Sequence, residues 1–501
     1  MSSEAGSRRR RIILNSDGAA LISRFQPCPM GVEGLIDEVF TPLRGSHVDT
    51  IFWALGSAVD GIHASNQWAH RTKLGQIFGE GMTEFPSEEY RRRALNIRDF
   101  FARNTDPAEI VVNHAHKIGM EAFLSIRMND CHEGIFGGHY VGKIKLDHPD
   151  WTLGERAPIP MFRYAFDFTR EESRKYRRDL IDEACSNYDL DGFELDFLRH
   201  PIFFAAADLE RGRPIITQFV RDVRKILDRA GKAKSRRLFL AVRVPSTFAL
   251  SRNAGLDVKR WIQEGVIDIL TAGTMAGSVF RLPIEEYLQA TRGTGVQVHA
   301  HFGMGSPAGQ KHGSYHTDAM CRAQAALYWR AGVHGLYSFN ANVIPLFCDE
   351  HWNWQPLREM GEPKLIAHMD KHYLVDYQDF DTSSCYGAYV KEVMPGAPLP
   401  VTLRKHEVAA IPVEVADDFD EARSKGIGAE VQLQVQFDRA KVAESAALHW
   451  NRAPLLRNQQ EEWLRASLEP STVHLGCNEL QIVPACAGEV KAVEVLVHYA
   501  G

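Results

Sequence analysis

The segment "DLDGFELDFLRHP", residues 189–201, decides the fold that we predict for this chain. Apolar and acidic residues alternate in it, and an arginine, a histidine and a proline close it. Side chains of a β-strand point alternately to opposite faces, so Glu194 and Asp196 share one face while Phe193, Leu195 and Phe197 share the other. Because an unpaired buried charge is costly, this strand needs an interior where its acids find partners.

Seven further apolar segments surround this one, and amphipathic stretches with helical periodicity separate them. Strands that alternate with helices indicate βα units and a parallel sheet. Eight such units over about 370 residues predict an α/β fold of the (β/α)₈ TIM-barrel type with long loops. We predict the strands at residues 11–17, 48–56, 120–130, 192–198, 238–244, 266–272, 296–302 and 335–340.

Helix-start signals support these units. Asp106 followed by Pro107 predicts an N-cap with proline at the first helical position, and Gly119 predicts the end of that helix. Thr169 and Glu172 have the spacing of a capping box.

The pattern changes after residue 376. Apolar and polar residues then alternate with a period of two, which predicts a second, all-β domain. We therefore predict a catalytic barrel over residues 1–376 and a β-sandwich-like accessory domain over residues 377–501. A structural cap on the barrel is favoured for the second domain over a sugar-binding role.

Composition excludes several function classes. A net charge of −6 with 45% hydrophobic residues is ordinary for a globular protein and gives no basic face for nucleic acid. We find no apolar run long enough for a membrane span, and no signal-peptide pattern. The eight cysteines are scattered without a C-x-x-C pair. These features predict a cytoplasmic protein with no nucleic-acid or membrane partner, and they leave a homo-oligomer open.

The polar residues of the predicted strands gather on the inner face at the C-terminal ends, where barrels of this kind carry their active sites. We expect Arg127 and Arg243 to pair with Glu194 and Asp196. The alternative is an ion-pair network with a purely structural role. The inward-facing set comprises Asn15, Asp17, Ser125, Arg127, Asn129, Glu194, Asp196, Arg243, Gln297, His299 and His301.

Residues 188–201 resemble the fourth strand of the family-10-like glycosyl hydrolase barrel proteins, with a tyrosine, D-x-D-G, an apolar alternation, an aspartate and a proline. "LDVKRWIQEGVIDIL" (256–270) and "GLYSFN" (335–340) are similar to further elements of such barrels. The resemblance implies a glycosidic-bond hydrolase with Asp196 at the group's strand-four aspartate. Partial similarity to the α-amylase element maps its nucleophilic aspartate to Asp196 and its histidine to His200, but Glu194 stands where that family has arginine, so the amylase mechanism is not carried over. The chitinase pattern aligns with Asp191, Glu194 and Asp196. Leu198 stands where chitinases have their acid, so that mechanism is not carried over.

Glycoside hydrolysis uses two carboxyl groups that flank the bond. Asp196 is our first catalytic candidate, and Glu194 is either the second or orients Asp196 and Arg243. Like charges this close would raise one pKa, as a general acid requires. Other candidates for the second carboxyl group are Asp17, Asp130, Glu133, Asp268 and Glu350.

A carbohydrate is the expected partner, and no metal or cofactor belongs to the leading hypothesis. The predicted substrate contacts are Asn15, Asp17, Trp53, Arg127, Asn129, His132, Arg199, His200, Arg243, His299, His301, Tyr337 and Asn340. Further aromatic residues that could stack on sugars are Trp68, Trp151, Trp352 and Trp354.

Two other hypotheses remain. One is a metal-dependent sugar lyase or isomerase, in which His299, His301, Glu194 and Asp196 bind the ion. The other is a carbohydrate-binding barrel without catalysis.

Overall fold

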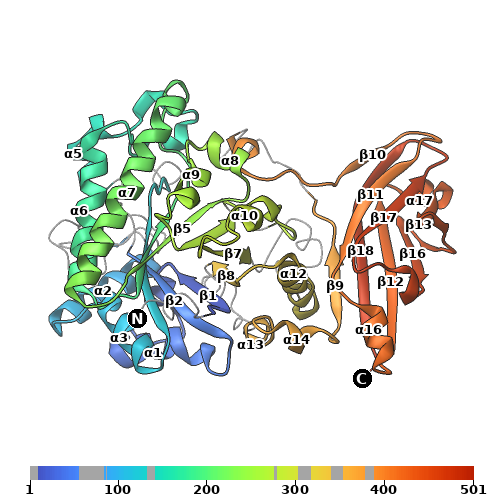
Figure 1. Cartoon of the computed structure of the whole chain (residues 1–501), viewed down its shortest axis with the longest axis horizontal. Helices are drawn as coiled ribbons and strands as arrows, with labels where there is room; N and C mark the ends of the chain where they lie inside the picture. The colour runs from blue at the N-terminus through green and yellow to red at the C-terminus, as the bar shows by residue number, and fades with distance from the viewer. Residues whose placement is uncertain are drawn as a thin grey trace.

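The structure is a computed structural model of the chain, shown in Figure 1. It describes residues 9–55, 84–85, 87–132, 142–275, 279–302, 317–339, 354–377 and 389–500.

Eight parallel strands form a closed barrel in chain order, and β1 closes it by pairing with β8. The predicted TIM barrel is therefore confirmed. Its strands are β1 (Ile12–Ser16), β2 (Val48–Ala54), β3 (Glu121–Arg127), β4 (Gly192–Asp196), β5 (Phe239–Pro245), β6 (Ile269–Gly273), β7 (Gln297–Phe302) and β8 (Gly335–Phe339).

The alternation expected for residues 192–198 is also confirmed. Phe193, Leu195 and Phe197 are fully buried in the large apolar layer between the barrel and its helices. A second, smaller apolar cluster lies inside the barrel and contains Phe52 and Phe123. Glycine makes room for these rings: a Cβ on Gly192 would lie 2.2 Å from a ring carbon of Phe123. The space inside the barrel is thus a packed core, and its polar side chains must find partners within it.

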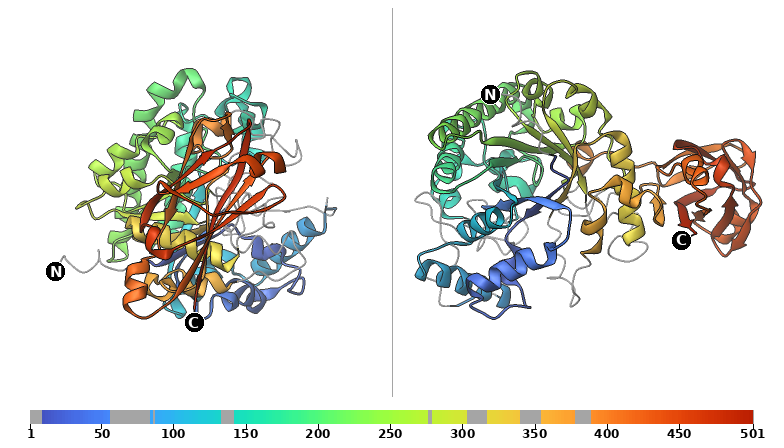
Figure 2. Two further views of the ribbon diagram at one scale, coloured as in Figure 1. Left: turned by 90° about the vertical axis from the view of Figure 1, so that its right-hand side faces the viewer. Right: turned by 60° about the horizontal axis from the view of Figure 1, so that its bottom comes forward.

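Helices surround the barrel, and α6 and α7, the two longest in the described part of the chain, lie side by side, with α7 against β5 (Figures 1 and 2). The helices of this region are α1 (Gly31–Phe40), α2 (Glu88–Ala102), α3 (Pro107–Lys117), α5 (Lys143–Asp147), α6 (Glu171–Asn187), α7 (Leu209–Ala233), α8 (Phe248–Asn253), α9 (Val258–Gln263), α10 (Glu285–Ala290), α12 (Asp318–Ala331), α13 (Gln355–Glu359) and α14 (Pro363–Ile366).

One predicted helix start is confirmed and the other is wrong. The Asp106 carboxylate accepts a 2.7 Å hydrogen bond from the Glu109 amide, and Pro107 opens α3 as predicted. The capping box at Thr169 does not form, because α6 begins at Glu171 after Arg170. The Thr169 hydroxyl donates instead to the Asp167 carboxylate at 2.7 Å.

Two antiparallel sheets form the C-terminal part, which stands beside the barrel in Figure 1. Both sheets contribute to one apolar core, so the predicted sandwich is confirmed. The strand β9 pairs with β18 in one of these sheets although it precedes residue 377, the expected start of the domain. The elements are β9 (Lys371–Leu374), α15 (Val390–Val393), β10 (Val401–Leu403), β11 (Ala409–Val415), α16 (Phe419–Ser424), β12 (Ala429–Phe437), α17 (Ala440–Ser445), β13 (Ala447–Trp450), β14 (Ala453–Pro454), β15 (Asn458–Gln460), β16 (Trp463–Leu468), β17 (Gly476–Val483) and β18 (Gly488–Tyr499).

The helix α12 joins the two parts. Met320, Ala323 and Leu327 on this helix belong to the apolar core of the sandwich, while Cys321 and Tyr328 belong to the core of the barrel. Among the described residues, no helix combines the length and the apolar character that crossing a bilayer requires.

Candidate functional site

Glu194 lies in the middle of the barrel and is fully buried. Its Oε2 atom accepts three hydrogen bonds, from the Asn15 amide at 3.1 Å, the Ser125 hydroxyl at 2.5 Å and the Tyr337 hydroxyl at 3.0 Å. Its Oε1 atom has no hydrogen-bond partner among the described residues. Three strands thus fix one carboxyl oxygen and leave the other unbonded.

Asp196 lies one layer nearer the C-terminal end of the barrel and is 1% exposed. Nη1 of Arg243 donates to both of its oxygens, each at 2.9 Å. The backbone amides of Leu198 and Arg199 donate to its Oδ1 at 2.9 Å and 3.2 Å. The expected pairing of Arg243 with a β4 acid is therefore confirmed.

The two acids of β4 occupy unlike environments. Burial, and then the negative charge of Asp196, raise the pKa of Glu194 from 4.5 to about 7, although the hydrogen bonds from Ser125 and Tyr337 act against this rise. A carboxyl group with this pKa holds its proton over part of the neutral range. Because Oε2 already accepts three donors, we expect the proton to reside on Oε1.

A chain of polar contacts lies at the C-terminal end of the barrel and runs from Asp17 through Arg127, Asp130 and His132 to Arg199. Arg127 donates to Asp17 at 3.3 Å and to Asp130 at 3.2 Å, so its expected pairing with the β4 acids is wrong. Asp130 also bonds to the His132 ring through Nδ1, and the Arg199 guanidinium lies 2.6 Å from Nε2 of the same ring. Arg127, Asp130 and His132 are at most 2% exposed.

Phe339 lies among the cations at this end. The guanidinium of Arg243 is 3.9 Å from its ring centre and that of Arg127 is 5.5 Å away. The ring of His301 meets it edge-on at 5.7 Å. Phe339 was not among the predicted site residues. Its spacing of two residues from Tyr337 on β8 could have placed it on the inner face of the barrel.

Several predicted contacts have other roles. Trp53 belongs to the apolar layer outside the barrel, because Phe52 before it points inward. Asn129 bonds to the backbone of Phe166 and of Ile202, which fixes the loop after β3. His299 lies near the other end, where Nε2 donates to the carbonyl of Arg10 at 3.2 Å.

The remaining predicted site residues either lie away from the β4 acids or fall outside the described residues. Trp151 stacks on His148 at 4.1 Å outside the barrel, and Trp354 packs against the outer core. Asp268 binds Arg224 and Arg237 at the start of β6, away from the β4 acids. The residues that lie outside the described part of the chain are Trp68, Glu133, Asn340, Glu350 and Trp352.

The ligand set of the metal hypothesis is not assembled. Among the described residues, one group of three potential ligand atoms lies within 4.8 Å, and it consists of Asp130, His132 and His200. An arginine only donates, so Nε2 of His132 accepts from Arg199 and its Nδ1 carries the proton. Nδ1 of His200 accepts from the Cys131 amide at 3.1 Å. Both ring nitrogens that would bind an ion are thus engaged, so this arrangement does not fit a metal.

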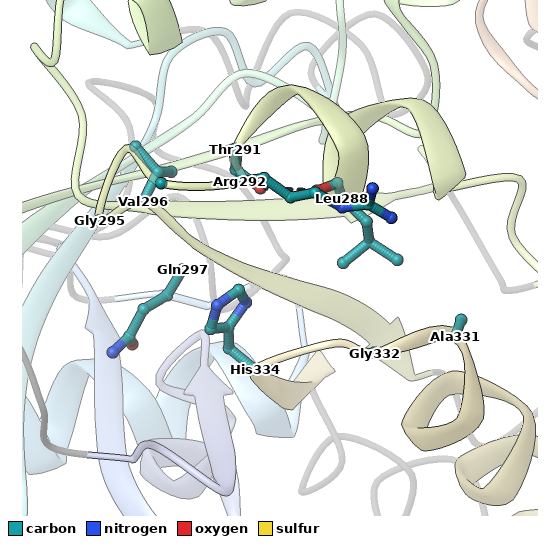
Figure 3. A pocket seen from close by; sticks show the side chains of 10 residues that line it. Leu288, Thr291, Arg292, Gly295, Val296, Gln297, Ala331, Gly332 and His334 are labelled. Carbon is teal, nitrogen blue, oxygen red and sulfur yellow. Dashed lines mark hydrogen bonds between the residues drawn. The ribbon is translucent and has the colours of Figure 1, made fainter.

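A cavity of about 430 Å³ lies at the opposite end of the barrel, where the residues before β7 and before β8 meet (Figure 3). Thr291, Val296 and His334 line part of it. His334 also accepts a 3.0 Å hydrogen bond from the Val298 amide. The cavity faces the N-terminal ends of the strands, so it is separate from the acids of β4.

No family model matches the chain, and no curated protein matches it either. The family-10-like assignment therefore stays a prediction. Solved structures do match. The α-L-fucosidase isoenzyme 2 from Paenibacillus thiaminolyticus is 9% identical with a TM-score of 0.44, over 99% of this chain and 100% of that chain.

Two further matches have similar scores. The glycoside hydrolase domain of PgaB (BpsB) from Bordetella bronchiseptica is 10% identical with a TM-score of 0.44, over 71% of this chain and 99% of its own. A family GH18 chitinase from Chromobacterium violaceum is 10% identical with a TM-score of 0.40, over 99% of this chain and 89% of its own. All three are glycoside hydrolases, but similarity at this level carries no information about the chemistry of this chain.

Proposed function

We propose that this protein is a glycoside hydrolase whose site lies at the C-terminal end of the barrel. The observation that carries the proposal is the pair of inward acids on β4, of which Glu194 has its pKa raised to about 7. Two carboxyl groups with unlike environments are what acid–base cleavage of a glycosidic bond requires.

The two acids have different roles in this proposal. Asp196 lies nearer the C-terminal end and is the carboxyl group that we expect to contact the substrate. Glu194 lies beneath it and holds the proton of the pair, while Asn15, Ser125 and Tyr337 fix its orientation. Arg243 holds Asp196 through both oxygens, which keeps the carboxylate in one orientation.

The same end of the barrel offers groups that suit a carbohydrate. The ring of Phe339 has an apolar face for a sugar, and the chain of polar side chains from Asp17 to Arg199 offers donors and acceptors for hydroxyl groups. The resemblance of residues 188–201 to a glycosyl hydrolase strand supports the same substrate class.

The test is turnover of a panel of aryl glycosides and oligosaccharides by the full chain and by Asp196→Asn. Asparagine keeps the size of the side chain and one oxygen acceptor, so we expect a folded protein whose turnover falls by about 10³-fold or more.

The matched control is Asp268→Asn, which makes the same change in an ion-paired aspartate near the N-terminal end of the strands. We expect this control to keep its activity. Full turnover by folded Asp196→Asn would overturn the assignment of Asp196. A wild-type chain that binds sugars without cleaving any of the panel would favour the non-catalytic barrel instead.

A further inference from the structure

We propose that Asp130 and His132 form a second acid–base pair of this site, in which His132 is the general base and Asp130 positions it. The inference rests on the proposed function and deepens it, since it supplies the group that would accept the proton of the attacking water. It starts from the tautomer of one buried imidazole.

The tautomer follows from the partners of His132. Arg199 has only donors, so the nitrogen that lies 2.6 Å from its guanidinium, Nε2, must offer a lone pair. The proton of the neutral ring is then on Nδ1, and it is donated to Oδ1 of Asp130. A buried carboxylate that holds an imidazole in this tautomer is the arrangement that prepares Nε2 to accept a proton.

The charges around Asp130 keep it able to play this part. Burial alone would raise its pKa, but the hydrogen bond with the His132 ring and the positive charge of Arg127 hold the pKa of Asp130 well below its usual range. Lys145 adds a further contact, since its ammonium donates to the backbone carbonyl of Asp130 at 3.1 Å. Asp130 therefore remains an acceptor for the Nδ1 proton.

Arg199 connects this pair with the acids of β4. Its backbone amide donates to Asp196 at 3.2 Å, and its side chain reaches His132. The Nε2 lone pair is thus directed toward the residue that follows the β4 acids. Arg199 is only partly buried, so its guanidinium can exchange its place at Nε2 for a water molecule when a substrate binds.

The pair would serve the attack of a water molecule on the anomeric carbon of the substrate. The water oxygen forms a bond to the anomeric carbon while its proton passes to Nε2 of His132. The bond from that carbon to the leaving oxygen breaks, and the leaving oxygen keeps the electron pair and takes the proton held by Glu194, which Asp196, the acid nearer the C-terminal end, passes on. His132 then releases its proton to solvent, and Glu194 regains one.

Activity is the first test. We expect His132→Gln and Asp130→Asn each to lower kcat by about 10²–10⁴-fold. Exogenous imidazole should restore part of the activity of His132→Ala. The control is His299→Gln, a change at a second buried histidine, which we expect to keep its kcat because it lies near the other end of the barrel.

The pH profile of kcat separates a base from a structural residue. His132 faces Asp130 from its own segment and Arg199 and His200 from the segment after β4. If His132 is the base, the acid limb of the profile disappears in His132→Gln. An unchanged acid limb in a folded variant would overturn the role of His132.

A second measurement does not depend on activity. ¹⁵N shifts of labelled histidine in the full chain report which ring nitrogen carries the proton, and His132→Gln assigns the signal. We expect protonated Nδ1, with a shift of that signal in Asp130→Asn. Protonated Nε2 would refute the pair even in an active enzyme, whereas an inactive wild-type chain with protonated Nδ1 would refute the proposed function alone.

Discussion

The two ends of the barrel interior carry charges in contrasting arrangements. At the N-terminal end, Arg10 binds both oxygens of Glu121 at 2.6 Å and 3.0 Å and also donates to Gln297 at 3.0 Å. Its guanidinium lies 4.5 Å from the ring centre of Phe239. One cation meets one anion there, and an aromatic ring covers the pair.

At the C-terminal end the charges do not match one to one. Asp17 and Asp130 share Arg127, and Asp196 is paired with Arg243 above a carboxyl group whose pKa is raised to about 7. Glu194 keeps an oxygen without a partner among the described residues. A buried acid whose pKa is strongly shifted beside a specific charge partner is a feature of functional sites. The difference supports our proposal that the site lies at the C-terminal end.

The strongest test of this difference between the two ends of the barrel is the variant Glu194→Gln. The amide can still accept from Asn15, Ser125 and Tyr337 through its oxygen, but it holds no acidic proton. We expect kcat to fall by about 10²–10⁴-fold, measured on the substrate that the wild-type chain cleaves best. Equal turnover in both proteins would leave Glu194 with a structural role only.

The same variant tests the raised pKa through stability. The folded state keeps the Glu194 proton between pH 4.5 and about 7, where the unfolded chain has lost it. The free energy of unfolding should therefore decrease as the pH rises through this window, by about 3 kcal/mol in total. Glu194→Gln should lack this decrease, so urea denaturation of both proteins at pH 4.5 to 8 should give curves that diverge. Parallel curves would contradict the raised pKa.

The other end is tested by Arg10→Met. This change leaves Glu121 buried without its cation, and such a loss costs about 3–5 kcal/mol. We expect a lower urea midpoint but an unchanged kcat per folded molecule, since the pair lies away from the β4 acids. The double variant Arg10→Met/Glu121→Gln should recover part of the stability. A fall in kcat without a fall in stability would show that the two ends are coupled.

The sequence predicted the barrel because alternation and helix periodicity act locally. Glu194 and Asp196 could be placed inside from their neighbours alone. The same rule would have placed Trp53 outside, since Phe52 and Ala54 share the opposite face of β2. Trp53 was nevertheless predicted as a substrate contact because it is aromatic. Within a strand, the alternation of faces therefore predicts the direction of a side chain better than its residue type does.

Partners across the barrel could not be predicted in the same way. Arg127 lies beside Asp196 in the strand register, yet its guanidinium turns to Asp17 on the β1 side and to Asp130 after β3. Such choices depend on where each long side chain finds a free acceptor in three dimensions. The role that we propose for His132 likewise depends on its contact with Arg199, which lies 67 residues later in the chain.

The finest test of the comparison is Tyr337→Phe, which removes one of the three donors to Glu194 and keeps the ring in the core. That donor favours the charged carboxylate, so its loss should raise the pKa of Glu194 further and move the pH dependence of kcat upward. The stability cost should be about 1 kcal/mol, as for a single buried hydrogen bond.

The control is Tyr287→Phe, since that buried hydroxyl donates to the Pro245 carbonyl at 2.8 Å outside the barrel. Both variants should lose similar stability, but only Tyr337→Phe should shift the pH profile, because only its hydroxyl touches the acid that holds the proton. An equal shift in both would mean that the profile reports general loosening of the fold and not the charge of Glu194.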